Sequence, residues 1–405
     1  MRRLSDLPAP PGPTRASFWR SPLRSTWTTT LIGLVLLLAL TVVAVTGFLS
    51  HSAYQPDLGR NAPLGRGADL QLLVVGWPTS PSWIYALTQG LHVAVGTALV
   101  PLLLAKLWSV IPQLFAWPPV RDPLHAIERA ATGLLVASAI FQLATGLANA
   151  QLWYPWHFDF LGAHYYGGLV LTASVLLHVA VRLPRMRSAW RTRQELEPLR
   201  DDALRSPRPA EETISRRGML AGVGATSALL AVLTGGQALG GPFRRLALFA
   251  PRGTGTRGLP VNKTARVARI TAAMVGPEWR LRLGEERALR RDELLALEQH
   301  EEVLPIACVE GWSSTQTWSG VRLRDLAALA GVPDADELRV ESLQPQGAFR
   351  RASLGRAQVH DERSLLALRL NGADLPPDHG YPARIIVPGL PGVHCTKWVG
   401  ELWFS

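Results

Sequence analysis

Long apolar runs in the first 240 residues of this 405-residue chain constrain its fold more than any other feature. A helix that spans the hydrocarbon core of a bilayer needs about 20 predominantly apolar residues. The sequence therefore predicts five membrane-spanning helices. The runs that approach or exceed this length lie at 27–49, 83–108, 126–152, 158–183 and 219–233.

Composition divides the chain into a membrane part and a separate domain. A mean hydropathy of +0.11 with 18% charged residues is too apolar for an ordinary soluble enzyme, and the apolar excess lies before residue 240. The remainder consists of short mixed segments with many Gly and Pro residues. We predict a disordered cytoplasmic lead at 1–26, an all-α four-helix membrane domain at 27–185, a cytoplasmic linker at 186–215, an anchor helix at 216–239 and an exported domain at 240–405.

The distribution of arginine predicts the orientation of the spans. The stretch 182–217 holds ten arginines, whereas 51–82 holds two. Because basic loops stay on the cytoplasmic side, we expect 240–405 to lie outside the cytoplasm of a bacterial cell, anchored in the inner-membrane bilayer by several passes. The net charge of +11 is explained by this topology. Nucleic-acid binding is not expected, because no Lys/Arg stripe is interleaved with aromatic residues.

Three histidines lie inside the predicted spans, where an ionisable side chain is costly and usually functional. His164 and His178 are separated by about 21 Å of helical rise and lie about 40° short of four full turns apart, so both rings leave one face. His92 and His164 are expected at similar depths. This arrangement predicts an outer haem b with these two imidazoles as axial ligands. The alternative is that both histidines are hydrogen-bonded within a helix bundle.

The spans also show an internal repeat, since Thr46-Gly47 near the end of the first is echoed by Thr145-Gly146 near the end of the third. Aligning the two copies places Lys106 opposite His178. An inner haem would then need another ligand, and His125 is the candidate, although it is expected about 9 Å shallower than His178. The sequence therefore predicts one haem and leaves open whether there is a second. The pattern resembles four-helix membrane cytochromes b of the b561 type, which exchange electrons between quinols and an attached redox protein.

Cysteine occurs twice, and Cys308 begins the run Cys-Val-Glu-Gly-Trp-Ser. A thiolate is a soft ligand for a transition metal, whereas a lone cysteine is more often a small buried hydrophobe. Two further blocks follow in order, at 318–323 and at 380–398. The three blocks resemble the molybdenum-binding segments of the sulfite oxidase family. The resemblance implies an α+β molybdopterin-binding domain in which Cys308 is the catalytic residue and the one protein ligand of molybdenum.

The resemblance to the periplasmic methionine sulfoxide reductase branch of that family also implies a set of cofactor contacts. Arg384 and Lys397 suit a pterin phosphate, because charge-assisted hydrogen bonds to an anion are strong; the alternative is that both are surface cations. His379 and Cys395 depart from the family pattern. We expect both cysteines to remain thiols, because a disulfide would abolish metal ligation. The implied contacts are Asn262, Ala265, Arg266, Ser342, His379, Arg384, Cys395, Thr396 and Lys397.

Local patterns predict the secondary structure of 240–405 and the export route. β-branched content and alternation indicate strands at 267–270, 279–283, 338–341, 366–370 and 383–387, and short helices at 291–299 and 322–330. The run Ser215-Arg216-Arg217-Gly218 before the fifth span resembles a twin-arginine signal for export of folded proteins. The alternative is a basic flank of an ordinary span.

The two parts together predict a membrane-bound oxidoreductase that uses Mo-molybdopterin and haem b. We expect it to reduce a small-molecule or protein sulfoxide with electrons from the quinone/quinol pool or another respiratory carrier. One alternative is oxidation of sulfite or a related compound, with electrons passed to the respiratory chain. Another is a non-catalytic, membrane-tethered module that binds pterin or a partner. Arg350 and Arg351 are candidates for placing an anionic substrate, or are exposed cations.

Overall fold

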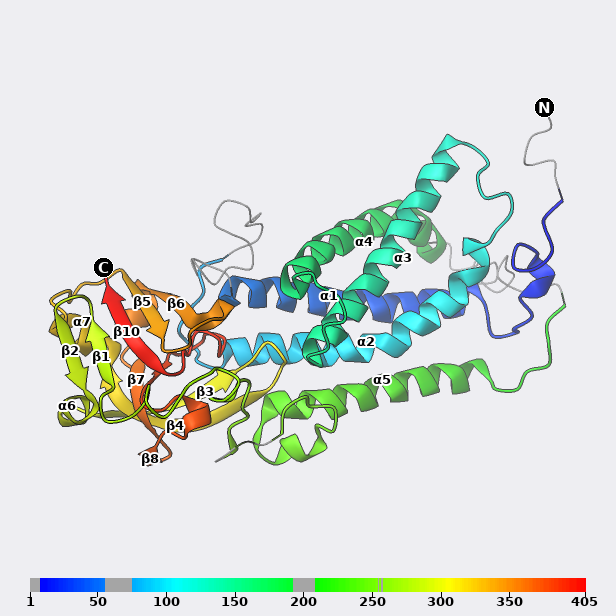
Figure 1. Cartoon of the computed structure of the whole chain (residues 1–405). Helices are drawn as coiled ribbons and strands as arrows, with labels where there is room; N and C mark the ends of the chain where they lie inside the picture. Colours follow the sequence, from blue (N-terminus) through cyan, green and yellow to red (C-terminus); the bar gives the residue numbers. More distant parts are fainter. Residues whose placement is uncertain (1–7, 55–74, 192–207, 254, 256–257) are drawn as a thin grey trace. The chain divides into compact units, whose positions relative to one another are not determined.

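The computed structural model describes residues 8–54, 75–191, 208–253, 255 and 258–405 (Figure 1). The chain forms two compact units, and helices of the N-terminal half contribute to both. The predicted disordered lead falls partly outside the described residues, at 1–7, and so does much of the predicted linker, at 192–207. The first unit combines 1–44, 94–149 and 154–231, and the second combines 45–93, 150–153 and 232–405.

All five predicted spans are α-helices, each long and apolar enough to cross a membrane by length and composition. Pro101 inside the second helix is compatible with such a role, because prolines are common in membrane helices. The sidedness of the helices stays a prediction. Their bounds are α1 (Thr26–Tyr54), α2 (Ile84–Leu114), α3 (Pro123–Ala150), α4 (Phe160–Arg191) and α5 (Arg216–Leu239).

The first unit has a core of aliphatic side chains from α1 to α4, centred on Leu36, Leu99 and Leu171. Lys106 of α2 lies within this unit and donates from Nζ to the Thr29 carbonyl of α1 at 2.8 Å. Gly33 makes room for this contact, since a Cβ there would lie 2.8 Å from Nζ. Lys106 is thus anchored to the backbone of the neighbouring helix.

The second unit contains two five-stranded sheets, so the predicted α+β class of the C-terminal domain is confirmed. The first sheet has the order β2-β1-β10-β5-β6, in which β1 and β10 are parallel and the other pairs antiparallel. Its strands are β1 (Arg280–Leu283), β2 (Arg287–Arg290), β5 (Glu337–Ser342), β6 (Arg351–Gly355) and β10 (Val399–Phe404).

The second sheet is antiparallel and has the order β3-β4-β7-β8, with β9 paired to β7. The strands of this sheet are β3 (His300–Ala307), β4 (Ser313–Arg322), β7 (Leu365–Leu370), β8 (Ala373–Asp374) and β9 (Arg384–Ile386). The 3-10 turn η5 (Gly241–Leu246) follows α5. Short helices connect the strands: α6 (Arg291–Ala296), α7 (Leu323–Leu329), α8 (Arg356–His360), and the 3-10 turns η7 (Ala348–Arg350) and η8 (Pro377–His379).

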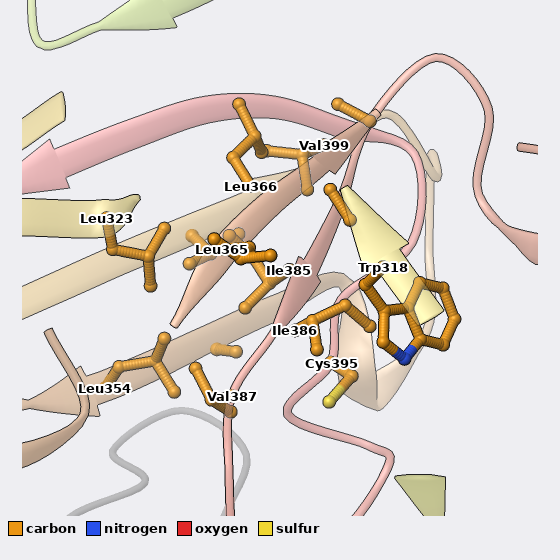
Figure 2. Close-up of a cluster of buried hydrophobic side chains, with 14 of the residues drawn as sticks. Trp318, Leu323, Leu354, Leu365, Leu366, Ile385, Ile386, Val387, Cys395 and Val399 are labelled. Atoms are coloured by element: carbon orange, nitrogen blue, oxygen red, sulfur yellow. The ribbon is translucent and has the colours of Figure 1, made fainter. Parts of the chain in front are cut away.

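One continuous hydrophobic core joins the two sheets to the ends of α1 and α2 that belong to this unit. Figure 2 shows Cys395 among Ile386 and Trp318 in the centre of this core. Ala53 of α1 and Tyr85 of α2 belong to the same cluster and are almost fully buried. The helix ends are therefore part of the folded C-terminal domain rather than a loosely attached stalk.

Two local predictions need correction. The strand predicted at 267–270 is wrong, because these residues form a turn in which Arg269 has φ +58°. Its backbone bonds close locally, from Ala268 to Thr264 and from Ile270 to Ala265, so no amide is left to pair with a strand. The helix predicted at 291–299 ends three residues early, at Ala296.

Candidate functional site

Cys308 lies in a tight turn between β3 and β4, the strands that precede and follow it. The amide of Cys308 donates to the Trp312 carbonyl and that of Gly311 to the Cys308 carbonyl, both at 2.9 Å. Gly311 adopts φ +87°, a conformation that favours glycine. The turn holds the Cys308 side chain in the interior, where the residue is only 4% exposed.

A buried carboxylate fixes the same turn. Glu310 accepts from Arg252 at 3.1 Å and from the Trp312 indole at 2.8 Å, and it is 3% exposed. Because removing one partner of a buried charge pair leaves the other uncompensated, this network ties the Cys-Val-Glu-Gly-Trp run to a segment far away in the sequence. The Glu and Trp of the motif therefore have structural reasons to be there.

The environment of Cys308 decides its protonation in the absence of a metal. Burial raises the pKa of the thiol to about 12, and the nearby Glu310 carboxylate contributes in the same direction. Backbone hydrogen bonds and Arg252 oppose the rise without cancelling it. A bound metal cation would displace this proton, since thiolate is the ligating form.

Two buried cations lie among the predicted cofactor contacts. Arg384 is 5% and Lys397 8% exposed, and among the described residues neither forms an ion pair with a carboxylate. Burial lowers the pKa of Arg384 to about 10 and lowers that of Lys397 well below its ordinary value. Because buried charges are normally paired, two such cations indicate that an anionic ligand belongs beside them.

Hydrogen bonds bring most of the predicted cofactor contacts together. Lys397 donates from Nζ to the carbonyls of Lys263 and Asp378. The Asp378 carboxylate accepts from the Ala265 amide at 2.8 Å, and Ser342 donates to the Lys397 carbonyl at 2.7 Å. A further bond, from Arg384 to the His379 carbonyl at 3.2 Å, adds the buried His379.

Polar atoms in this region suit a polar cofactor. Arg384 Nε and Thr396 Oγ1 are buried, and the described residues offer them no hydrogen-bond partner. Such atoms are rare in folded proteins and usually have a ligand or water. Gly380, at φ +113°, keeps the space between Arg384 and Lys397 open, because a Cβ there would lie 3.2 and 3.1 Å from their Cβ atoms. The donors present fit a phosphate-bearing pterin.

The remaining predicted contacts differ in position. Cys395 is 3% exposed and, like Cys308, is a free thiol, as predicted. Asn262 is half-buried in the turn before Ala265, whereas Arg266 is exposed. Exposure of Arg266 makes it the least favourable of the predicted contacts for holding a buried anion.

Comparison with known proteins identifies the C-terminal part. Residues 268–405 match the family model described as "Oxidoreductase molybdopterin binding domain". This part of the chain is an oxidoreductase molybdopterin-binding domain of the sulfite oxidase family. The mitochondrial sulfite oxidase of Homo sapiens is 38% identical over 120 residues, covering 28% of this chain and 22% of that protein.

Other relatives of the molybdopterin domain include a further sulfite oxidase, a nitrate reductase and a sulfane dehydrogenase. The sulfite oxidase of Gallus gallus is 39% identical, covering 24% of this chain and 22% of that protein. The NADH nitrate reductase of Volvox carteri is also 39% identical, over 22% of this chain and 12% of that protein. The solved sulfane dehydrogenase SoxCD from Paracoccus pantotrophus aligns at 26% identity and a TM-score of 0.29, over 32% of this chain and 38% of that chain. The chain spans about a quarter of the first relatives' length.

The helices carry two histidines in similar settings. Thr145 Oγ1 lies 2.9 Å from Nδ1 of His164 and donates its own hydrogen to the Phe141 carbonyl at 2.7 Å. The Thr145 oxygen is thus available to accept from Nδ1, and in the tautomer with the hydrogen on Nδ1 the lone pair for a metal lies on Nε2. Gly146 lets the ring approach the backbone, since a Cβ there would lie 3.1 Å from Cε1 of His164.

His92 on α2 meets α1 in the same way. A Cβ on Gly47 would lie 2.7 Å from Cε1 of His92, so only glycine admits the ring at this position. The Thr46-Gly47 and Thr145-Gly146 pairs thus each accompany one histidine, which supports the predicted internal repeat. The donor type and the glycine cradles fit a haem with imidazole ligands.

The two candidate ligands of an inner haem, His178 and His125, lie on different helices of the first unit. His178 lies on the uninterrupted helix α4 together with His164, as the fourteen-residue spacing requires. His125 lies in the first turn of α3, where its Nδ1 accepts from the Arg121 amide at 3.3 Å. The prediction that His178 and His125 bind a second haem stays a prediction.

Sequence reasoning missed two glutamines that hold the Cys308 turn. Gln89 of α2 donates to the Val309 carbonyl at 2.6 Å, and Gln237 of α5 donates to the Glu310 carbonyl at 2.9 Å. The signal was present, because a polar amide inside an apolar span requires a partner. The partner itself lay far away in the sequence and carried no pattern.

Proposed function

We propose that the whole chain is a membrane-bound molybdopterin oxidoreductase in which Cys308 ligates molybdenum. The observation that carries this proposal is the pair of buried cations Arg384 and Lys397, which form no ion pair with a carboxylate among the described residues. Both lie close enough to the buried Cys308 thiol, at the family's ligand position, to interact with it electrostatically. In this proposal both cations bind the terminal phosphate of the pterin. Ala265, Ser342 and Thr396 line the same binding region.

The bound cofactor would supply two-electron oxygen-atom chemistry at the metal. The chain's own residues hold and shield that centre. Cys308 fixes the metal at the end of β3, and Arg252, Glu310 and Trp312 keep the turn rigid. Burial excludes water and strengthens each electrostatic contact with the anionic cofactor.

We further propose that the helical part binds haem b, with His92 and His164 as axial ligands, and receives electrons from a quinol or another respiratory carrier. Support comes from the glycine cradle at each ring and from the Thr145 bond that sets the tautomer of His164. The apolar helices and the arginine distribution favour an inner-membrane location, with the molybdopterin domain on the extracytoplasmic side. Export through the twin-arginine route, read from Arg216 and Arg217, belongs to the same proposal.

The proposed substrate is a sulfoxide, on a small molecule or a protein. Arg350 and Arg351, the sequence candidates for binding an anion, both pair with the Glu341 carboxylate. Their charge is thereby used within the fold, which favours a neutral substrate. The second candidate is oxidation of sulfite, favoured by the named activity of the sulfite oxidases of Homo sapiens and Gallus gallus.

Metal analysis and one optical experiment test the proposal. The full chain purified from a cofactor-competent host should contain about one molybdenum, and Cys308→Ser should lose it while Cys395→Ser retains it. Haem reduced beforehand with dithionite should be reoxidised by methionine sulfoxide. Reduction of oxidised haem by sulfite would instead support the second candidate. Undiminished molybdenum in Cys308→Ser would overturn both.

A further inference from the structure

Three successive residues after Cys308 are held by parts of α2 and α5 that belong to the second unit. Gln89 of α2 binds the Val309 carbonyl at 2.6 Å. Gln237 of α5 binds the Glu310 carbonyl at 2.9 Å. The Gly311 backbone packs on Val93 of α2, since a Cβ there would lie 2.9 Å from the Val93 Cβ.

Both amides are buried, Gln89 to 9% and Gln237 to 3% exposure. A buried amide or carbonyl that loses its partner is left desolvated without a hydrogen bond, which destabilises the fold. These bonds therefore hold the Cys308 turn in one position relative to the helix turns that donate them. The position matters most on α2, because that helix also carries His92.

The contacts on α2 bracket His92. Gln89 precedes it by three residues, about 4.5 Å of helical rise, and Val93 follows it directly. Gly47 of α1 leaves room for the imidazole. One turn of α2 thus contacts the turn that begins at Cys308 and also presents the histidine. No predicted haem ligand lies on α5.

We propose that Gln89 is the positioning residue that couples the Cys308 turn electronically to His92, an inference that rests on the proposed function above. The route runs from the Cys308 thiolate through the Val309 carbonyl, across the hydrogen bond to the Gln89 amide, and along one turn of α2 to the imidazole. With both cofactors bound, each transfer in the reductive direction would take one electron from the haem held by His92 and give it to the molybdenum centre held by Cys308. Two transfers and two protons from water convert one sulfoxide to a thioether and water.

Gln237 provides a matched control for this role. Its amide donates to the next carbonyl of the same turn, it is at least as buried, and it comes from a helix without a predicted haem ligand. A purely structural function of Gln89 predicts equal effects of the two substitutions. An electron-transfer function predicts that only the Gln89 substitution affects exchange with the haem.

The test uses the full chain loaded with both cofactors, comparing Gln89→Leu with Gln237→Leu. Haem reduced beforehand is mixed rapidly with methionine sulfoxide, and its reoxidation rate is divided by the rate of sulfoxide reduction driven by a soluble dye. In Gln89→Leu this ratio should fall by about tenfold or more, because small displacements of reacting groups carry penalties of that size. In Gln237→Leu the ratio should stay at the wild-type value.

Hydrogen exchange of the 306–313 amides in protein without molybdopterin supplies a readout that is independent of turnover. The amides of this segment should exchange faster in both variants, because each variant loses one hydrogen bond that holds the turn. Equal falls of the ratio in both variants, or an unchanged ratio in Gln89→Leu, would overturn the proposal. If Gln89→Leu does not accumulate, Gln89→Met replaces it with a side chain of similar length. The molybdenum content of Cys308→Ser distinguishes the two failures. If only this inference fails, that variant still loses molybdenum; if the proposed function fails, it keeps the metal.

Discussion

Arg384 lies over the indole of Trp318, with 5.5 Å between its guanidinium carbon and the ring centroid. Lys397 makes the equivalent contact with Trp398 at 4.6 Å. A cation over an indole face is partly stabilised by the ring quadrupole, which helps to keep both charges tolerable in the core. The tryptophans of the later two sequence blocks therefore cover the cations of the same site.

Arg384→Met should separate cofactor binding from folding. It removes a buried cation that forms no ion pair with a carboxylate among the described residues, but also the bond to the His379 carbonyl, so the thermal stability of cofactor-free protein should change little. Loss of a charge-assisted bond of about 1.5–3 kcal/mol should lower pterin and molybdenum content at limiting cofactor by about tenfold or more. Arg369→Met, at an exposed position of β7, should change neither quantity. Full cofactor content in Arg384→Met would contradict the assignment.

The ion pairs of Glu341 with Arg350 and Arg351 should stabilise the domain at neutral pH and lose this effect in acid. Burial alone would raise the pKa of Glu341, but the bonds and charges of Arg351 and Arg350 outweigh it, so its pKa lies below the ordinary 4.5. A lowered folded-state pKa gives stabilisation that is complete above 4.5 and lost as the pH falls through the folded value. At neutral pH the free energy of unfolding of the wild type should exceed that of Glu341→Gln by about 1 kcal/mol. Denaturant titrations should show this difference shrinking below pH 4.5; a constant difference would refute the pairing.

Gly320→Ala should destabilise the molybdopterin domain strongly. A Cβ at this position would lie 2.0 Å from the Leu366 carbonyl, at the irregularity where β4 pairs with β7. Neither backbone can retreat without breaking the sheet, so we expect a loss of about 3 kcal/mol or more. Calorimetry should show a lower melting temperature for this domain. Gly253→Ala, where no atom lies within 4 Å of the added carbon, is the control.

Local sequence patterns predicted what is encoded locally. Apolar runs are sufficient to define the five helices, and the motif around Cys308 predicted the family because its Glu and Trp serve the turn itself. The strand predicted at 267–270 failed because Thr264 and Ala265 accept its amides within the turn, an outcome that β-branched content does not reveal.

Long-range contacts were beyond the same reasoning. Arg252 looked like one more basic residue, yet it neutralises Glu310 across 58 positions. Gln89 looked like a polar residue in a span, yet its partner Val309 lies 220 positions away. A carbonyl acceptor is present in every residue, so no side-chain pattern marks which one an amide will find.

Thr145→Val should change the redox behaviour of a haem bound at His164. The threonine hydroxyl donates to the Phe141 carbonyl, which leaves its oxygen available as an acceptor 2.9 Å from His164 Nδ1. That acceptor increases electron donation from the imidazole and stabilises ferric iron. Without it the midpoint potential should rise, measured by redox titration of the b-type absorbance, and haem content should fall. Thr132→Val removes a comparable hydroxyl, bonded to the Glu128 carbonyl of the same helix, and should leave the potential unchanged. A lower potential in Thr145→Val, or equal shifts in both variants, would show that Thr145 does not set the tautomer of His164.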